Sequence, residues 1–392
     1  MMKPTHEHKY AFILPEDEPY SASKGGAIAT FTQAIVKELA SLGSLALIVT
    51  PRLDETPYDA GDLHELKLVG GPRSRVRWLM IRALGRVFPG RFGRRERYVR
   101  EVVEYAGELS EHTTIVVAND PALAASIREA CANPIVIWLH NYLRGAQAEE
   151  LGALPSATRV VTVSESVRTW TQEQCHVAAE LITVIYNGVD HVSFRPPLQR
   201  HDSERLRVAF CGRIDPNKGQ LLGAQAVRAA QEGGATGIEL TVIGGLRAFD
   251  SSEEAAAAYY AELCRTVEAC NGTMLGRIPA TSMAAALREF DVALILPLVP
   301  EPFGLTAVEA LASGCAVIAI PTGGVAEVVG DAALAVRPEL HSIADALTSL
   351  ATSRGLLAEL QSRALVQSRI FSWRRAAIAL ESLTSAPSPE AE

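Results

Sequence analysis

The chain has 392 residues, of which 48% are hydrophobic, and its formal net charge at pH 7 is −8. This length exceeds what one ordinary hydrophobic core accommodates and predicts two domains, and the acidic balance argues against a nucleic-acid partner. The six cysteines form no CxxC pair, which argues against a disulfide framework or a clustered metal site and predicts reduced, packed thiols. No segment is apolar over the length of a membrane span, and the N-terminus lacks the apolar core of a signal peptide, so we expect a cytoplasmic protein.

The first half of the chain alternates short apolar runs with helical stretches. Runs of Val, Ile and Leu without polar alternation, each followed by a helix, are typical of parallel strands buried on both faces. The first long helix is expected after Gly25 and Gly26 and should end near Gly43. The pattern predicts a doubly wound, Rossmann-like α/β domain over residues 1–193. Its expected strands are residues 10–14, 45–49, 114–118, 135–139, 159–163 and 181–186.

Arginine is concentrated between residues 73 and 100, where ten arginines accompany a single acid, Glu96. Apolar residues such as Val76, Met80 and Leu84 recur there at helical spacing. An amphipathic basic helix of this kind can lie on an anionic membrane, where each cation near the surface contributes about 1 kcal/mol. The alternative is a helix of the first domain whose arginines meet solvent or bind an anionic acceptor. Association with the inner face of the membrane is therefore an open alternative to a freely cytoplasmic protein.

A polar, proline-containing stretch, residues 194–204, interrupts the pattern and reads as a linker. A second doubly wound domain is expected over residues 205–370, followed by a helix over 371–386. Because ligands bind beyond the carboxyl ends of strands in open α/β sheets, two facing sheets would place the site in the cleft between them. The strands expected in the second domain are residues 206–211, 239–243, 272–275, 292–296 and 316–320.

The segment from Glu301 to Gly314 is the most informative part of the sequence. It follows a predicted strand and reads as a tight loop and the start of a helix. Backbone N–H groups at a helix start are unpaired and carry partial positive charge, which suits a phosphate. Glu301 and Glu309 accompany this helix start, and carboxylates suit hydroxyl groups. The combination predicts a ligand in which a phosphate is bonded to a sugar.

A second charged motif follows the predicted strand at residues 206–211. Arg213 and Lys218 lie in a turn that opens a helix. Two cations on such a loop can bind a diphosphate and take up the charge of a leaving group, as a metal ion does elsewhere. The sequence has no D-x-D motif at a strand end, which is consistent with the absence of a metal site.

These motifs form part of a longer series that occurs in one order along the chain. The series resembles the GT-B retaining glycosyltransferases of family 4, and the resemblance covers essentially the whole chain. Even F-S-W at residues 371–373 is similar to the family's final segment, in which the last helix crosses back to the N-terminal domain. The series consists of G-G at 25–26, V-S-E-S-V at 163–167, Y-N-G-V-D at 186–190, G-R-x-x-x-x-K-G at 212–219 and E-x-F-G-L-x-x-x-E-A-x-A-x-G at 301–314.

The resemblance implies a nucleoside-diphosphate sugar as donor, with a UDP-sugar favoured and a GDP-sugar as the alternative. It also implies transfer with retention of the anomeric configuration and no requirement for a metal ion or other cofactor. By position, Arg213 and Lys218 would bind the donor diphosphate and stabilise the leaving phosphate. Glu309 would hold the ribose hydroxyls, and Glu301 would hold a hydroxyl of the transferred sugar.

Other donor-binding positions follow from the same resemblance. Gly26 would bring a helix N-terminus of the first domain to the phosphate. Gly244 lies in a loop that would flank the nucleotide, and the backbone around Ile278 would read the base. The remaining N–H groups, which would serve the sugar or the phosphate, belong to Phe303, Gly304 and Leu305.

His140 ends the predicted strand at residues 135–139, where the family commonly has a histidine near the reacting sugar. It would hydrogen-bond the 6-hydroxyl of the sugar or help the glycosyl cation form, whereas the alternative is a core histidine with a structural role. The resemblance implies a front-face route in which the leaving phosphate accepts the proton of the acceptor, so no general base is assigned. The expected catalytic residues are Arg213, Lys218, Glu301 and His140.

The expected function is the transfer of a hexose-type sugar to a carbohydrate or lipid-linked acceptor in the synthesis of cell-envelope polysaccharide or glycoconjugates. One alternative is a small soluble acceptor, such as a secondary metabolite or a thiol or inositol compound. Another is a non-catalytic sugar-nucleotide-binding protein of the same fold, although such a protein would lose the charged positions that this chain retains. A phosphorylase would carry a pyridoxal lysine in a longer chain, which nothing in the sequence indicates.

Overall fold

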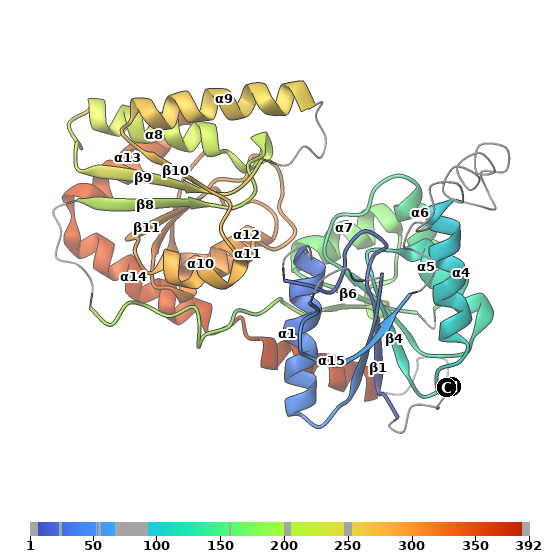
Figure 1. Ribbon diagram of the computed structural model, residues 1–392. Coiled ribbons are helices and arrows are strands. Elements are labelled where there is room, and N and C mark those ends of the chain that lie inside the picture. Colours follow the sequence, from blue (N-terminus) through green and yellow to red (C-terminus); the bar gives the residue numbers. More distant parts are fainter. Residues whose placement is uncertain are drawn as a thin grey trace. The chain divides into compact units, whose positions relative to one another are not determined.

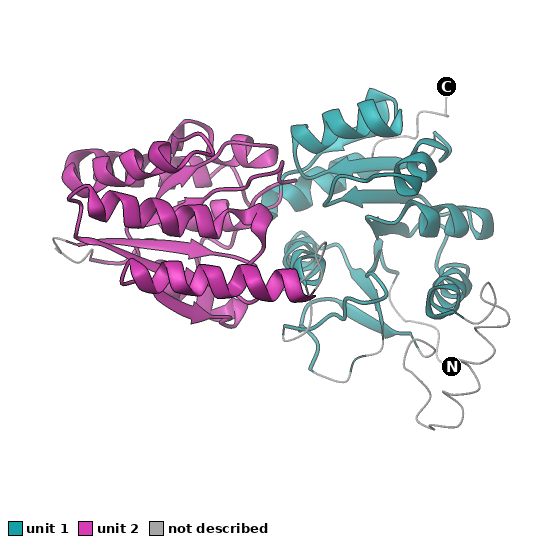
Figure 2. Cartoon of the chain, turned by 90° about the horizontal axis from the view of Figure 1, so that it is seen from above, with its two compact units in different colours: residues 1–186, 373–392 teal, residues 187–372 magenta. Residues whose placement is uncertain are grey.

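The computed structural model describes residues 7–22, 26–51, 53, 56–66, 93–156, 158–199, 205–246 and 253–385. The chain forms two compact units, which Figure 2 shows in different colours. Unit 1 comprises residues 1–186 together with 373–392, and unit 2 comprises residues 187–372. Most of the arginine-rich segment, residues 73–92, lies outside the described residues, as do Gly25 and residues 200–204 of the expected linker.

Unit 1 is built on a parallel sheet with the strand order β3-β2-β1-β4-β5-β6-β7. Its central strands are unbroken apolar runs because helices cover both faces of the sheet (Figure 1). The order reverses between β1 and β4, as in a doubly wound domain. The strands are β1 (Tyr10–Ile13), β2 (Ala46–Thr50), β3 (Asp62–Glu65), β4 (Thr114–Ala118), β5 (Ile135–Leu139), β6 (Arg159–Thr162) and β7 (Ile182–Val184).

Several helices of unit 1 begin at residues whose side chains cap them. Asp120 accepts the backbone N–H of Leu123 at 3.0 Å at the start of α5, and Ser164 accepts that of Val167 at 3.1 Å at the start of α7. The described part of the chain contains no helix with the length and apolar content needed to span a bilayer. The helices that follow the strands of unit 1 are α1 (Ala27–Ser41), α4 (Arg94–Ala106), α5 (Pro121–Ala130), α6 (Ala146–Gly152) and α7 (Glu165–Cys175).

The helix α15 (Trp373–Ser385) follows unit 2 in the sequence but packs on unit 1. Its Trp373 ring lies 5.8 Å from the ring of Phe31 on α1 in an edge-to-face arrangement. Near its other end, Thr384 Oγ1 lies 2.8 Å from the hydroxyl oxygen of Tyr10 on β1. The expected return of the last helix to the N-terminal domain is therefore confirmed.

Unit 2 repeats the doubly wound architecture with a parallel sheet in the order β10-β9-β8-β11-β12-β13. The order again reverses beside the first strand of the unit, between β8 and β11. The expectation of two Rossmann-like sheets is confirmed. The strands of unit 2 are β8 (Leu206–Cys211), β9 (Ile238–Ile243), β10 (Thr273–Gly276), β11 (Val292–Ile295), β12 (Ala316–Ala319) and β13 (Ala333–Ala335).

The helices of unit 2 form two layers, one on each face of the sheet (Figure 1). Helices α8, α9 and α13 pack together on one face, and α11, α12 and α14 pack together on the other. The layer of α8, α9 and α13 buries apolar side chains against one face of the sheet in a continuous cluster. The second layer buries others, among them Val308 and Leu311 of α11 and Val328 of α12. The helices are α8 (Gln220–Glu232), α9 (Glu253–Ala269), α10 (Ala280–Leu287), α11 (Leu305–Ala312), α12 (Gly324–Val329), α13 (Leu340–Thr352) and α14 (Arg354–Ser368).

Two strands at sheet edges are absent from the sequence-based prediction. β3 reads D-L-H-E and has no fully buried residue, and β13 spans only three residues. Edge strands need not be apolar on both faces, and proteins often keep them short or charged. Their sequences therefore lack the apolar run by which the central strands are recognised.

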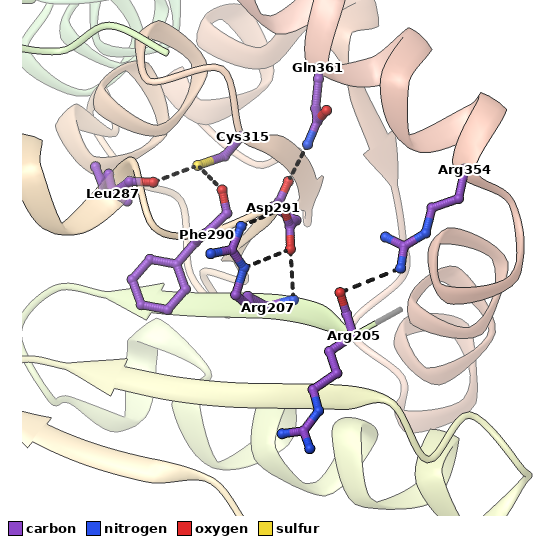
Figure 3. Close-up of polar contacts among 8 residues, drawn as sticks. All are labelled: Arg205, Arg207, Leu287, Phe290, Asp291, Cys315, Arg354 and Gln361. Atoms are coloured by element: carbon purple, nitrogen blue, oxygen red, sulfur yellow. Dashed lines mark hydrogen bonds and ion pairs between the residues drawn. The ribbon is translucent and has the colours of Figure 1, made fainter. Parts of the chain in front are cut away.

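The amino ends of β8 and β11 are joined by a bidentate ion pair between Arg207 and Asp291 (Figure 3). The guanidinium donates through Nε and Nη2 to the two carboxylate oxygens, each at 3.1 Å, and the Arg207 backbone N–H donates to Oδ2 at 3.0 Å. Hydrogen bonding to this carboxylate raises the pKa of the Arg207 guanidinium. From α14, Gln361 donates to the Asp291 carbonyl at 3.1 Å. One buried aspartate thus connects both central strands to a helix.

The same two strands are paired only near their amino ends. β8 and β11 are in register only at Val208 with Val292 and Ala209 with Ala293, whereas β11 and β12 pair along four residues. The last residues of β8, Phe210 and Cys211, have no partner in that ladder. The ladder between the two strands therefore covers only their amino-terminal part.

Replacing Asp291 tests how much the unit depends on this ion pair. Asp291→Ala leaves the partly buried Arg207 charge without its partner, so we expect the free energy of unfolding to fall by about 3 kcal/mol, measured by urea denaturation. Asp291→Asn retains an acceptor and should lose less. The matched control is Glu232→Ala, which removes an exposed pair with Arg228 on α8 and should cost no more than about 1 kcal/mol. A loss in D291A no larger than in the control would contradict this role.

Candidate active site

A pocket of about 150 Å³ lies at the carboxyl ends of β8 and β11 in unit 2. These are the strands between which the sheet order reverses, the place where open α/β sheets bind ligands. Three charged side chains line the pocket: Arg213, Lys218 and Glu301. The remaining lining comes from the ends of the two strands and from the first turn of α11. The structure thus brings together the two motifs that the sequence analysis singled out.

The loop after β8 presents its two cations from a closely packed backbone. Lys218 is the last residue of a short 3₁₀ turn, η2 (Pro216–Lys218), and Gly219 follows in the left-handed region with φ 76°. A Cβ at Gly219 would lie 2.3 Å from the carbonyl oxygen of Leu296 at the end of β11, so only glycine fits there. The close approach of this turn to β11 fixes where Lys218 enters the pocket.

Each of the two cations has a carboxylate partner. Lys218 Nζ lies 2.5 Å from Glu301 Oε1, and Arg213 Nη2 lies 3.3 Å from Asp215 Oδ2. The Lys218 and Glu301 side chains are partly buried, so solvent screens their attraction less than at an exposed surface. The charges of these four groups cancel. Asp215 is not among the site residues expected from the sequence, although it stands between the two cations in the chain.

The start of α11 forms another wall of the pocket. Gly304 precedes the helix with φ 99° and provides no side-chain cap, and the first N–H groups of a helix have no partner within it. Glu301 reaches the pocket from a loop whose backbone is paired with the segment before α12, where Gly324 donates to the Glu301 carbonyl at 2.7 Å. Thr306, in the first turn, also lines the pocket and is a further residue that the sequence analysis misses.

Glu309 lies one helical turn below the pocket wall and does not line the pocket. Burial raises the pKa of its carboxyl to about 7 from an ordinary value of 4.5. Burial raises the pKa of the Cys211 thiol at the end of β8, and electrostatic interactions with Cys315 and then with Glu309 raise it further. The residue is half-buried, and a glutamate in a partly desolvated position costs free energy when it is ionised, which supports a function beyond packing.

The other expected donor-binding positions of unit 2 do not line the pocket. Phe303 is buried, with its ring 5.7 Å from that of Phe371, and Leu305 is the first residue of α11. Gly244 follows β9, and a Cβ there would lie 1.8 Å from the Gly212 carbonyl oxygen, so the loops after β8 and β9 touch. Ile278, half-buried, lies in the loop between β10 and α10.

The N-terminus of α1 in unit 1 already has a carboxylate beside it. Glu18 Oε1 accepts the N–H of Ala29 at 2.7 Å, and a Cβ at Gly26 would lie 2.8 Å from the same oxygen. Burial raises the pKa of Glu18, while the backbone N–H groups of the first turn lower it to a smaller extent. The sequence gives no sign of this contact, because Glu18 lies in an irregular loop. Phosphate binding at Gly26 stays a prediction.

His140 lies at the end of β5 in unit 1, as the sequence predicts. Its Nε2 atom is buried without a hydrogen-bond partner, and its ring packs edge-to-face on Phe31 at 4.5 Å. Burial lowers the pKa of His140 to about 3, so the imidazole is neutral at physiological pH. Beside it, Asn119 has φ 55°, an uncommon conformation for a residue with a side chain. Its Oδ1 accepts a hydrogen bond from the backbone N–H of His140 at 2.7 Å. A neutral histidine of this kind can hydrogen-bond a ligand but cannot act as a general acid.

Solved structures of glycosyltransferases share this fold. The sucrose-phosphate synthase of Thermosynechococcus elongatus superimposes with a TM-score of 0.73 and 16% identity, over 96% of this chain and 98% of the other. HepE of Anabaena, in complex with UDP and glucose, superimposes with a TM-score of 0.71 and 20% identity, over 97% of this chain and 100% of the other. WaaG, a glycosyltransferase of lipopolysaccharide biosynthesis, superimposes with a TM-score of 0.69 and 13% identity, over 96% of this chain and 100% of the other.

Family models match both halves of the sequence. Residues 25–192 match the model described as Glycosyltransferase Family 4, and residues 205–353 match the model described as Glycosyl transferases group 1. The chain is a GT-B glycosyltransferase of family 4. The second match spans the loop after β8, the segment from Glu301 to Gly314 and the pocket that they form.

Curated relatives of this glycosyltransferase are themselves glycosyltransferases. The lipopolysaccharide 1,2-N-acetylglucosaminetransferase of Salmonella typhimurium is 26% identical over 318 residues, 78% of each chain. The putative glycosyltransferase YtcC of Bacillus subtilis is 26% identical over 82% of this chain and 77% of its own. The D-inositol 3-phosphate glycosyltransferase of a Nocardioides strain is 30% identical, but over 50% of this chain and 46% of its own length.

The raised pKa of Glu309 predicts a pH-dependent effect on the stability of this glycosyltransferase. Between pH 4.5 and about 7 the folded protein holds a proton on Glu309 that the unfolded chain has released, so the free energy of unfolding falls as pH rises through this interval. Glutamine cannot ionise. We therefore expect Glu309→Gln to raise the melting temperature, and to raise it more at pH 8 than at pH 5.

The measurement is a thermal melt of both proteins at the two pH values. Glu254→Gln is the matched control, because it removes an exposed carboxylate from α9 in the same unit. If the stabilisation by E309Q were the same at pH 5 and pH 8, Glu309 would not be a desolvated carboxylate.

Proposed function

We propose that this glycosyltransferase moves a hexose-type sugar from a nucleoside-diphosphate sugar to an acceptor hydroxyl, with retention of the anomeric configuration and without a metal ion. The observation that carries the proposal is the pocket in which Arg213, Lys218 and Glu301 meet the start of α11. Two cations and a helix N-terminus suit a diphosphate, and a carboxylate at the same place suits a sugar hydroxyl. HepE, a protein of the same fold, binds UDP and UDP-glucose, which favours a UDP-sugar.

The proposed roles assign each charge to one part of the donor. Arg213 and Lys218 bind the diphosphate. Glu301 accepts a hydrogen bond from a hydroxyl of the transferred sugar, and Glu309 accepts hydrogen bonds from the ribose hydroxyls. When the bond from the anomeric carbon to the phosphate oxygen breaks, its electron pair stays on the phosphate. The two cations stabilise that charge, the task that a metal ion performs in other enzymes.

The acceptor oxygen is proposed to bond to the anomeric carbon on the face from which the phosphate leaves, and the phosphate takes the acceptor proton. No enzymic base is needed for this route. His140, which is neutral, would donate a hydrogen bond to the sugar through one ring nitrogen or accept one from it through the other. Gly26 would contribute a helix N-terminus if the donor phosphate displaced Glu18 from it.

The proposed acceptor is a carbohydrate or a lipid-linked saccharide of the cell envelope. Similarity to the lipopolysaccharide transferase over most of both chains supports this class, and the arginines of residues 73–100 would suit an anionic membrane surface. Of these arginines, Arg95 pairs with Asp120 at 2.5 Å, so it is already engaged within unit 1. A small soluble acceptor is the alternative outcome of an acceptor screen, because the inositol-phosphate relatives are similar over half of the chain.

The proposal is tested by thermal-shift screening with UDP, GDP and ADP, followed by donor hydrolysis and transfer assays with the corresponding sugars. Stabilisation by one of the three nucleotides is expected. The anomeric configuration of the product, read by NMR, tests retention, and full activity in EDTA tests metal independence. A protein that none of the three nucleotides stabilises would not use such a donor.

Lys218→Ala is expected to lower kcat/KM by about a hundredfold or more, because it removes a charge that stabilises the leaving phosphate. The variant should remain folded, since Lys218 is partly exposed. Steady-state kinetics with the donor identified in the screen measure the loss. Full activity in folded K218A, or in folded Glu309→Ala, would show that these residues do not have the assigned roles.

Glu301→Gln is expected to have opposite effects on nucleotide binding and on transfer. In the free protein Glu301 pairs with Lys218 at 2.5 Å, so it competes with a phosphate for that ammonium group. Removing the charge should tighten binding of the nucleoside diphosphate without its sugar by about 1 kcal/mol, about fivefold in Kd. Transfer should slow, because the sugar hydroxyl loses its acceptor.

Isothermal titration calorimetry measures the first effect and steady-state kinetics the second. In a K218A background E301Q should leave the affinity for the nucleoside diphosphate unchanged, because the competed ammonium group is gone. Unchanged or weaker binding of the nucleoside diphosphate to E301Q itself would contradict the competition.

A further inference from the structure

Asp215 is a buried carboxylate beside the pocket to which neither the sequence motif nor the proposed reaction gives a role. The residue is 7% exposed. Its Oδ1 accepts the backbone N–H of Asn217 at 2.9 Å and so caps the turn η2, and its Oδ2 lies 3.3 Å from Arg213 Nη2. Its carbonyl accepts the N–H of Lys218 at 2.9 Å. One residue therefore contacts the guanidinium of Arg213 and the backbone of Lys218.

Capping alone does not explain a carboxylate at this position. Serine, threonine and asparagine cap helical turns as well as aspartate does, and they do so without burying a charge. Burying a carboxylate is costly unless it is paired, and its charged partner here is Arg213. The charge of Asp215, as distinct from its capping oxygen, therefore acts on the guanidinium.

The backbone of the loop is held by a different residue. Gln220, which is 1% exposed, donates from its side-chain amide to the Arg213 carbonyl at 2.7 Å. Its Oε1 also accepts the Asp215 N–H, at 3.5 Å. Because Gln220 holds the main chain, loss of the Asp215 charge should leave the path of the loop intact. It should loosen the side chain of Arg213, which loses this ion pair.

We infer that Asp215 is a positioning residue for donor binding: its carboxylate holds the Arg213 guanidinium at the pocket before the diphosphate arrives. The inference rests on the proposed function, because it presumes a ligand that carries a diphosphate. Arginine is a long side chain whose ordering costs free energy on binding, and a guanidinium fork has donors for a carboxylate on one edge and a phosphate on another. Prior ordering by Asp215 removes that cost from the binding step.

Asp215→Asn is the variant that separates charge from capping. Asparagine keeps an acceptor for the Asn217 N–H but removes the charge that faces Arg213. On the full chain, calorimetric titration with UDP, GDP and ADP identifies the nucleotide that binds wild type most tightly. With that nucleotide, D215N should raise Kd about tenfold, the cost of ordering one long side chain. Asp215→Ala, which also removes the cap, should raise it further.

A double-mutant cycle shows whether the effect passes through Arg213. In an Arg213→Ala background D215N should cause no further loss of affinity, because no guanidinium is left to position. A matched control is Glu239→Gln, which removes the carboxylate of another Arg pair, with Arg205, in the same unit and should leave Kd unchanged.

A spectroscopic measurement on the ligand-free protein tests the positioning directly. The Nε–H signal of Arg213, assigned by its absence from Arg213→Lys, should show an ordered side chain in wild type and a mobile one in D215N. A residue that only capped the turn would leave this signal unchanged, because asparagine retains the cap.

The outcomes separate this inference from the function on which it rests. If wild type binds none of the three nucleotides, the proposed donor is wrong. If wild type binds one of them and D215N binds it equally well, or loses equal affinity with and without Arg213, only the role of Asp215 is overturned. Failure of D215N to fold would also contradict the inference, which gives the charge no essential part in the fold.

Discussion

The pocket of unit 2 depends on how β8 and β11 are held together. Their amino ends are joined by the ion pair between partly buried Arg207 and buried Asp291, and their ladder stops before their carboxyl ends. A sheet that reverses direction at this point sends the two following loops to opposite sides, so the space between the strand ends is left open. An apolar pair at the amino ends would bury as much surface but would lack the direction of a bidentate contact. The pocket at the carboxyl ends of the two strands thus depends on the ion pair that holds their amino ends together.

The chemistry of the pocket arises from charges that are balanced without a ligand. Arg213 and Lys218 each have a carboxylate partner, so the loop after β8 can be partly buried without an uncompensated charge. The two carboxylates differ in what they can do next. Asp215 is buried and capped into the turn, whereas Glu301 lies on a loop and lines the pocket. We therefore expect Asp215 to keep its pairing with Arg213 when a ligand binds, and Glu301 to give up Lys218 to the ligand.

Much of this arrangement is predictable from the sequence, and the omissions have physical causes. The central strands and the start of α11 carry strong local signals: unbroken apolar runs, and a glycine before a helix flanked by glutamates. The edge strands β3 and β13 carry none. The partners of the charged residues cannot be predicted from the sequence. Glu301 and Lys218 are far apart in the chain, and Glu18 reaches the N-terminus of α1 from a loop without regular structure. Spacing identifies which residues carry charge, but only packing decides which charges meet.

The return of α15 to unit 1 has a consequence for the order in which this chain can fold during synthesis. Unit 2 is one continuous stretch of chain, so all of its strands and helices are available once residue 372 has been made. Unit 1 is discontinuous, because α1 and the hydroxyl of Tyr10 gain their contacts with α15 only after unit 2 has been made. Of the two units, the one whose synthesis begins first is therefore completed second. A chain cut between the units would leave the earlier one with an exposed apolar face and the later one whole.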